Sequence, residues 1–272
     1  MTRLLHAGID AIGLLGPGLH HWEQARPIFA GLAPWHPETT RVPPPAALPP
    51  AERRRCGIAT KAALGVAQQA LATASAPDSQ LATVFTSSGG DGVNCHEICA
   101  ALASEDRSIS PTRFHNSVLN APAGYWSIST GTMAPATVLC AHDGSFAAGL
   151  LEAMTQVQAD ERPVLLLAYD TSYPEPLFGL RPIPDAFGVA LLLTPAPGTS
   201  RIGRITLDPA SCLTDRPADT CRDAGMEQLR ASIPAARCLP LLHALARSGT
   251  TNITLGYLDG LQMQVSVDAN AD

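Results

Sequence analysis

Residues 136–159 read ATVLCAHDGSFAAGLLEAMTQVQA, and this stretch decides the fold class. Residues 136–141 form a short apolar run, which is typical of a buried strand. From residue 145 to residue 159, alanine, leucine and methionine recur at spacings of three and four residues, which is typical of a helix with one apolar face. The stretch therefore predicts a buried strand, a sharp turn at His142-Asp143-Gly144, and a helix.

The same alternation of strand and helix continues on both sides. Further strands are expected at residues 4–16, 81–86, 164–169, 188–193 and 201–207, and further helices at 52–74, 94–104 and 239–247, with another segment starting at Pro111. The alternation predicts an α/β fold. The continuous apolar run at 164–169 suits a sheet that is covered on both faces, so we expect a mixed or largely parallel sheet.

The pattern weakens toward the C-terminus. Residues 208–236 are expected to be irregular or loosely helical. Residues 253–258 and 261–267 are two apolar runs around Asp259-Gly260, and an Asp-Gly pair between such runs is a strong hairpin signal. We therefore expect a terminal β-hairpin.

Length and composition indicate one large globular domain of 272 residues. The net charge of -6 argues against a nucleic-acid-binding protein, because such proteins carry a basic patch. No stretch approaches the ~20 apolar residues of a membrane span, and the N-terminus leads into glycines rather than into a signal-peptide core. We expect a cytoplasmic protein with no membrane span.

The seven cysteines form no CxxC pair, and their odd number in a cytosolic setting disfavours disulfides. Cys95 and Cys99 lie one helical turn apart with His96 between them, which is the best candidate for a metal site. Two more ligands at suitable spacing are missing. We therefore expect no metal and no cofactor, and we interpret these cysteines as small buried apolar residues.

Several short motifs occur in a telling order. They are the basic run 53–55 that opens an alanine-rich helix, VFTSSG at 84–89, SPTRF at 110–114, SVLNAPAG at 117–124 with Asn120 and Gly124, and Ala134-Pro135 before the strand. In this order they resemble the N-terminal half of the β-ketoacyl synthases, over roughly residues 1–195. The SPTRF motif and the Asn120/Gly124 pair carry most of the resemblance.

The resemblance implies an α/β thiolase-like half, that is, a mixed sheet covered by helices, with a short C-terminal extension in place of the second half. Residues 1–195 are then a ketosynthase N-terminal-like domain. Residues 196–272 are expected to be a truncated C-terminal segment that completes the same domain.

The resemblance also implies where a nucleophile would lie. Active ketosynthases hold a cysteine at the turn between a buried strand and a helix N-terminus, where the helix dipole and nearby histidines favour the thiolate. Counting from Pro135, which matches the family's Gly-Pro pair, that position falls on Asp143. An aspartate is a poor acyl carrier because its mixed anhydride is labile. Asp143 is therefore expected to be a structural cap of the helix in a site without a nucleophile.

Cys140 is the fallback nucleophile. It is expected inside the strand, three residues before the turn, and His142 would serve as its base only if the turn were remodelled. Active synthases also use two histidines from their C-terminal half, whereas His243 is the only histidine after residue 142. With both parts missing we expect no catalytic residues, and little activity from the chain alone.

Condensing enzymes of this family work as dimers that pair through the strand before the nucleophile. By resemblance, residues 112–141 are therefore expected to form a subunit interface. Its large anchors would be Phe114, Tyr125, Trp126 and Met133, with Asn120 in the segment that reaches the partner. The alternative is that these side chains pack the chain's own core.

Three functions stay open at this stage. The first is a non-catalytic, chain-length-factor-like subunit that pairs with a full-length β-ketoacyl synthase in fatty acid or polyketide biosynthesis of the aryl polyene type, and meets acyl carrier protein indirectly. The second is a stand-alone acyl-transfer or malonyl-decarboxylating enzyme that uses Cys140 or Ser145. The third is a homodimeric protein that binds an acyl chain or acyl carrier protein.

Overall fold

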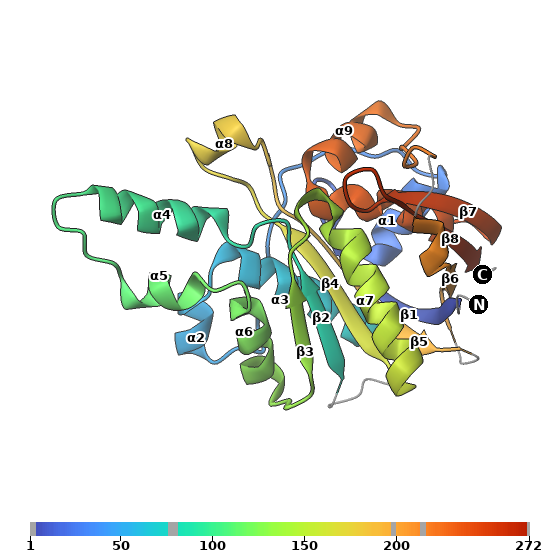
Figure 1. Ribbon diagram of the computed structural model, residues 1–272, viewed down its shortest axis with the longest axis horizontal. Coiled ribbons are helices and arrows are strands. Elements are labelled where there is room, and N and C mark those ends of the chain that lie inside the picture. The colour runs from blue at the N-terminus through green and yellow to red at the C-terminus, as the bar shows by residue number, and fades with distance from the viewer. Residues whose placement is uncertain (1–3, 76–80, 197–199, 213–215, 271–272) are drawn as a thin grey trace.

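The computed structural model describes residues 4–75, 81–196, 200–212 and 216–270. The strands in chain order are β1 (Leu5–Leu15), β2 (Ala82–Thr86), β3 (Ala136–Leu139), β4 (Val164–Asp170), β5 (Phe187–Pro195), β6 (Gly203–Leu207), β7 (Gly249–Gly256) and β8 (Gln262–Ala269). They form one 8-stranded sheet in the order β3-β2-β4-β5-β1-β6-β8-β7 (Figure 1). The strand β2 is parallel to β3 and β4, and every other neighbouring pair is antiparallel.

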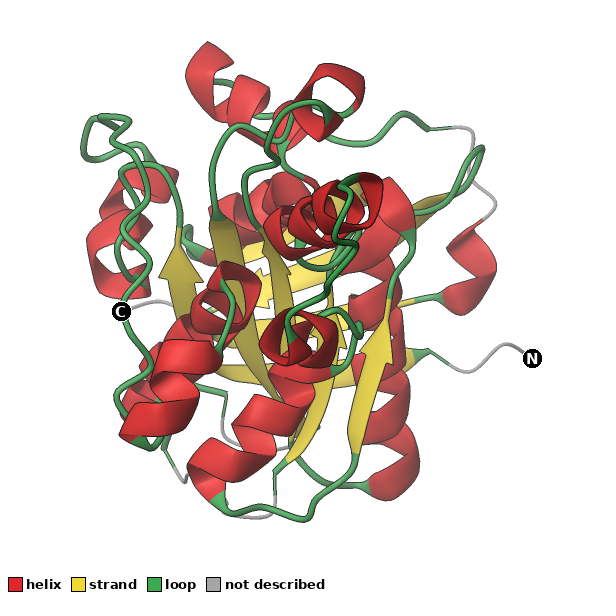
Figure 2. Cartoon of the chain, turned by 90° about the vertical axis from the view of Figure 1, so that its left-hand side faces the viewer, coloured by secondary structure: helices red, strands yellow, loops and turns green. Residues whose placement is uncertain are grey.

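Helices cover both faces of this sheet (Figure 2). The α-helices are α1 (Trp22–Ala30), α2 (Pro50–Arg55), α3 (Ile58–Thr73), α4 (Gly92–Ala103), α5 (Pro111–Asn116), α6 (Ala121–Thr130), α7 (Ser145–Asp160), α8 (Leu177–Leu180), α9 (Ala224–Ser232) and α10 (Leu239–Leu245). Three 3₁₀ turns are η1 (His142–Gly144), η2 (Pro209–Cys212) and η3 (Pro234–Cys238). The predicted α/β class, with a mixed sheet covered by helices, is confirmed.

The central strands are apolar on both faces because each face has its own core. In β4, Leu166 and Ala168 point to the face that carries α7, while Leu165 and Leu167 point to the face that carries α3. All seven β4 residues are buried. This explains why the run appears in the sequence as continuously apolar rather than alternating.

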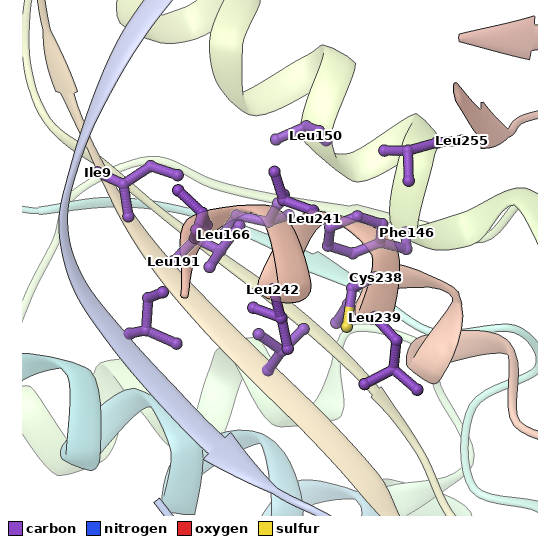
Figure 3. Packing of buried hydrophobic residues seen from close by; sticks show 14 of the residues in the cluster. Ile9, Phe146, Leu150, Leu166, Leu191, Cys238, Leu239, Leu241, Leu242 and Leu255 are labelled. Atoms are coloured by element: carbon purple, nitrogen blue, oxygen red, sulfur yellow. The ribbon is translucent and has the colours of Figure 1, made fainter. Parts of the chain in front are cut away.

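The helix α7 fills the first of these cores. Its buried residues are Ser145, Phe146, Ala147, Gly149, Leu150, Ala153, Met154 and Val157, which lie on one helical face. Figure 3 shows Leu241 of α10 between Leu166 of β4 and Phe146 of α7, and Leu150 of α7 belongs to the same core. The C-terminal helices therefore share a core with the strand-turn-helix at 136–159.

The strand β1 keeps one face apolar across a bulge. Leu5, Ala7 and Ile9 belong to the α7-side core, and the pairing register with β5 then shifts between Ile9 and Ala11. An extra residue in a strand reverses the parity of all later side chains. That residue is Asp10, and its buried carboxylate accepts hydrogen bonds from the backbone N–H and the hydroxyl of Ser75, at 2.8 and 2.7 Å.

The helix α3 lies almost entirely inside the protein, between the sheet and α6. The alanines of α3 and Gly13 of β1 let the helix and the strand approach each other closely. A Cβ at Gly13 would lie 1.9 Å from the carbonyl oxygen of Val66 in α3. The helix predicted at 52–74 is in fact two helices, because the chain is extended at Cys56 and Gly57 between α2 and α3.

Three helices were not predicted, namely α1, α6 and the four-residue α8. The helix α1 contains Pro27, and α6 begins with Pro122 near its start, so neither has a clean propensity signal. The region 208–236, expected to be irregular or loosely helical, holds the regular helix α9 and the turn η3. The predicted terminal hairpin is confirmed, since β7 pairs with β8 along its whole length.

The longest described helices, α3 and α7, have 16 residues each. A membrane-spanning helix needs about 20 residues of mainly apolar character. Within the described ranges, no helix combines the length and the hydropathy that crossing a bilayer requires.

Leu150→Ala tests the α7-side core. Leu150 is fully buried, so removing its side chain leaves a cavity that the neighbouring strands cannot fill. We expect the free energy of unfolding to fall by about 2–5 kcal/mol in urea titrations. Thr155→Ala, on the exposed side of the same helix, is the control and should change it by less than about 0.5 kcal/mol. Equal effects of the two changes would contradict this description of the core.

Candidate functional site

The site expected from the sequence lies at the bend between β3 and α7. Asp143 is the middle residue of η1, two residues before Ser145, where α7 begins. The bend is pressed against the C-terminal segment, because a Cβ at Gly144 would lie 1.6 Å from the carbonyl oxygen of Tyr257. Only glycine fits there. His142 has a positive φ of 50°, which is uncommon for a residue other than glycine, so the turn is strained as well as tight.

The carboxylate of Asp143 is held by two arginines. Arg181 donates from Nη2 to Oδ1 at 2.7 Å, and Arg237 donates from Nη2 to Oδ2 at 2.8 Å. Arg181 also contacts Nε2 of His142. Arg181 follows α8 and Arg237 belongs to η3, so the cluster ties three segments together at the bend.

The expectation that Asp143 caps α7 is wrong. Gly144 occupies the N-cap position, and no side chain makes a capping hydrogen bond there. The reason is electrostatic: two guanidinium groups offer charge-assisted hydrogen bonds, which are about twice as strong as a bond to a neutral backbone N–H. Asp143 therefore faces the arginines instead of the helix end.

This arrangement makes Asp143 a poor nucleophile. Each carboxylate oxygen already accepts a hydrogen bond from a cation, which draws electron density away from any attack on a thioester. The Asp143 side chain is 40% exposed, so the cluster lies at the surface of the site and water has access to it. What the cluster can do is hold the bend, α8 and η3 in fixed positions.

Among the described residues, no base is hydrogen-bonded to either alternative nucleophile. Cys140 follows the end of β3, and its thiol donates to the carbonyl oxygen of Ser88 at 3.1 Å. Ser145 is buried; its hydroxyl accepts from the N–H of Ala141 and has the carbonyl oxygens of His142 and Ser87 within 2.7 and 3.2 Å. A carbonyl oxygen cannot take the proton that an activated nucleophile must lose.

His243 is not brought to the bend. It lies in α10, where its Nδ1 is 3.0 Å from the carbonyl oxygen of Phe29 and its ring packs edge-on against the Phe29 ring. Burial lowers the pKa of His243, and the hydrogen bond to Phe29 acts in the opposite direction. Its place in the core gives it a packing role.

A second aspartate lies below the bend. Asp170, at the end of β4, is fully buried and accepts hydrogen bonds from the N–H and hydroxyl of Ser88, the hydroxyl of Ser87 and the N–H of Ala235. Burial raises its pKa, while these hydrogen bonds lower it. Asp170 thus joins the ends of β2 and β4 to η3. The glycine-rich segment at 88–92 is the tight loop that leads from β2 into α4.

A cavity of about 420 Å³ lies under the arm formed by α4 and α5, which projects from the sheet in Figure 1. Its walls are mainly apolar and come from α3, α4, α5, the 117–122 segment and the end of β4. Gly89 and Gly90 also contribute, next to the Ser88 carbonyl that Cys140 contacts.

The predicted interface anchors divide into two groups. Phe114 is 68% exposed and Met133 is 91% exposed, and Asn120 is also at the surface. For Tyr125 and Trp126 the interface prediction is wrong, because both are buried in the chain's own core against α3. Tyr125 and Trp126 lie on the buried face of α6, a helix that was not predicted, whereas Asn120 at the start of this helix is exposed.

Cys95 and Cys99 are exposed, so the expectation that they are buried is wrong. The arm that carries α4 projects from the sheet and leaves these side chains at the mouth of the cavity. In the portion of the chain with described side chains, no group of three or more His, Cys, Asp and Glu is placed to hold a metal ion.

A sequence profile described as "Beta-ketoacyl synthase, N-terminal domain" matches residues 22–253. That span contains the bend, the arm and the C-terminal helices. The chain belongs to the β-ketoacyl synthase family. No curated protein sequence matches it significantly.

Solved structures of β-ketoacyl synthases share its thiolase-like fold. A ketosynthase (ApeO) in complex with its chain length factor (ApeC) from Xenorhabdus doucetiae is similar over 96% of this chain and 99% of the matched chain, with a TM-score of 0.68 and 22% identity. The ishigamide ketosynthase/chain length factor is similar over 97% of this chain and 99% of the matched chain, with a TM-score of 0.70 and 14% identity. The AntDE:AntF complex is an acyl-carrier protein in complex with its ketosynthase bound to the hexaketide. It is similar over 98% of this chain and 100% of the matched chain, with a TM-score of 0.74 and 10% identity. Identities this low support a shared fold only.

Sequence reasoning missed Arg181, Arg237, Asp170 and Tyr169. Asp170 and Tyr169 end a buried strand, where polar side chains of this kind of fold gather, so a signal for them existed. The sequence contains no such signal for the two arginines. Arg181 lies in a proline-punctuated loop and Arg237 in a segment expected to be irregular, and nothing in the sequence pairs either with Asp143.

Asp143→Ala tests the arginine cluster. We expect the free energy of unfolding to fall by about 1 kcal/mol, because partly exposed ion pairs contribute little individually. Hydrogen exchange should rise at 177–181 and 234–238, and the difference in stability should shrink in 1 M salt. Asp160→Ala, which removes the surface partner of Arg162, is the matched control and should leave exchange in both segments unchanged. Unchanged exchange in Asp143→Ala would refute a locking role.

His243 should make stability fall at acidic pH. Its pKa is lowered in the folded chain, so the unfolded chain binds the proton more readily once the pH drops below about 6.5. The unfolding free energy should therefore be highest above that pH and decrease from pH 7 to pH 5. In His243→Asn this decrease should be shallower in urea titrations at each pH. The control, the exposed His20→Asn, should keep the original slope. Parallel slopes in all three proteins would contradict this assignment.

Proposed function

We propose that this chain is a non-catalytic subunit that pairs with a full-length ketosynthase, in the manner of a chain length factor, in fatty acid or polyketide biosynthesis of the aryl polyene type. The observation that carries the proposal is Asp143 at the bend before α7, with both carboxylate oxygens bonded to arginines. An ion-paired carboxylate occupies the position where, by family resemblance, a working synthase needs a free thiol.

The surroundings of the bend support a non-catalytic role. Cys140 and Ser145 donate toward carbonyl oxygens rather than to a base, and His243 is engaged with Phe29 in the core. A condensing reaction needs a nucleophile and groups that stabilise the carbanion, and these act as a unit. Losing both leaves little for the chain to catalyse alone.

The strand β3 supports pairing with another subunit. It is the edge of the sheet, and its outer backbone groups offer a template for another strand. Large apolar side chains are exposed in the segment that precedes it, namely Phe114, Val118, Leu119, Ile128 and Met133. Exposed apolar side chains concentrated in one segment support an interaction surface there.

The relatives support the class of partner. These solved structures are ketosynthases together with chain length factors, and a ketosynthase together with an acyl-carrier protein. Contact with a carrier protein would then come through the partner synthase. The cysteines whose side chains are described are all free thiols, which favours a reducing compartment such as the cytoplasm.

Co-expression with the full-length ketosynthase from the same gene neighbourhood tests the pairing. We expect a stable 1:1 complex on size-exclusion chromatography. Met133→Asp should weaken it by roughly tenfold or more, as expected when a buried interface anchor becomes charged. Leu180→Asp, in which an equally exposed apolar residue of α8 is changed, is the matched control and should leave the complex intact.

Product formation by that complex tests the absence of catalysis. Asp143→Ala should retain it, because no covalent step passes through this residue. The proposal fails if the chain forms only a homodimer while the synthase works unaided. It also fails if an acyl thioester adds mass to a peptide that contains Cys140 or Ser145, since that outcome identifies a stand-alone enzyme.

A further inference from the structure

The helix α4 carries two cysteines one turn apart on the same face. Cys95 and Cys99 are both free thiols with exposed side chains, and the two thiols are hydrogen-bonded to each other. Residues four apart in a helix are neighbours on its surface, with about 5–6 Å between their Cβ atoms. The arm therefore presents a pair of adjacent thiols that small molecules in solution reach directly.

The other cysteines whose side chains are described offer no such pair. Cys56, Cys221 and Cys238 are buried. Cys140 is exposed, but its thiol donates to the carbonyl oxygen of Ser88 rather than to a second sulfur. In the described part of the chain, two exposed thiols that contact each other therefore occur in α4 alone.

The surroundings of the pair suit a two-step exchange. Burial raises the pKa of Cys95, and the neighbouring Cys99 and Asp91 act in the same direction. Cys95 therefore keeps its proton at neutral pH, whereas the attacking species in thiol–disulfide exchange is a thiolate. This makes Cys95 suited to the second step, in which it reacts with a sulfur that Cys99 has already brought next to it.

The arm also leaves room for a bridge to form. A disulfide needs Cβ atoms about 3.5–4.5 Å apart, so this turn of α4 must tighten when the two sulfur atoms bond. The buried residues of α4 are Gly92 and Asn94, both at its start. The remainder of the helix projects from the sheet (Figure 1), so the turn between the cysteines adjusts without opening either core.

We propose that Cys95 and Cys99 form a reversible redox site, in which a low-molecular-weight disulfide of the glutathione class oxidises the pair to a disulfide within α4. The thiolate of Cys99 attacks one sulfur of the small disulfide, which forms a mixed disulfide and releases one small thiol. Cys95 then loses its proton, attacks the Cys99 sulfur and releases the second small thiol. The pair gives up two electrons and two protons, and the small disulfide is reduced to two thiols.

Oxidation changes the wall of the cavity under the arm. Cys95, Ile98, Cys99 and Leu102 line the cavity from one face of α4. Tightening the turn between the cysteines displaces Ile98, which lies between them. A strained and exposed disulfide is readily reduced again, which suits a switch. The inference goes beyond the pairing proposed above, because both cysteines lie outside the 112–141 segment assigned to that contact.

Titration of the full-length chain with mixtures of oxidised and reduced glutathione tests the site. We expect a species that is lighter by two hydrogen atoms in mass spectrometry and that regains them with dithiothreitol. Glu97 lies between the two cysteines. After free thiols are blocked, cleavage behind Glu97 by glutamyl endopeptidase should separate Cys95 from Cys99 in the reduced chain. In the oxidised chain the two fragments should stay linked until they are reduced.

Single variants separate the two steps of the exchange. Cys95→Ser should stop at a glutathione adduct on Cys99, because no second thiol is present to release it. Cys99→Ser should react severalfold more slowly at Cys95, because this thiol keeps its proton. Cys140→Ser removes an exposed thiol outside the pair and is the matched control, which should form the bridge as the unchanged chain does.

Hydrogen exchange over residues 92–103 tests the structural effect, and we expect it to rise in the oxidised chain and to return on reduction. The inference is overturned if excess oxidised glutathione leaves both thiols free, or if glutathione adducts accumulate there without a bridge. It is also overturned if the bridge joins Cys140 to either cysteine, or if exchange over 92–103 is equal in both forms. None of these results bears on whether the synthase complex forms.

Discussion

The carboxylate of Asp170 lies wholly inside the protein and accepts hydrogen bonds from Ser87, Ser88 and Ala235. These donors come from two segments that are far apart in the sequence from each other and from Asp170. A buried carboxylate without such partners would be strongly destabilising, so its hydrogen bonds fix where β2 ends, where β4 ends and where η3 begins. The positions of the bend, of Arg237 and of the cavity floor all follow from that junction.

The two aspartates of this region both bind η3, but through different kinds of hydrogen-bond donor. Asp170 is buried and neutral groups satisfy it, whereas Asp143 is partly exposed and is satisfied by the cations Arg181 and Arg237. Both draw η3 toward the sheet. The bend is occupied by an ion-pair cluster that holds segments together.

Some of the exposed apolar side chains also belong to the cavity wall. Phe114, Val118 and Leu119 are exposed and line the cavity under α4 and α5.

The sequence by itself determined the strand-turn-helix at 136–159, the double-sided burial of β4 and the terminal hairpin, because these depend on local periodicity and turn residues. The ordered motifs were enough to indicate the family. Only the tertiary structure decided that Asp143 binds two arginines, that Tyr125 and Trp126 turn inward, and that Asp170 joins the ends of β2 and β4 to η3. Each of these depends on contacts between segments distant in the chain, and their energies leave no periodic trace in the sequence.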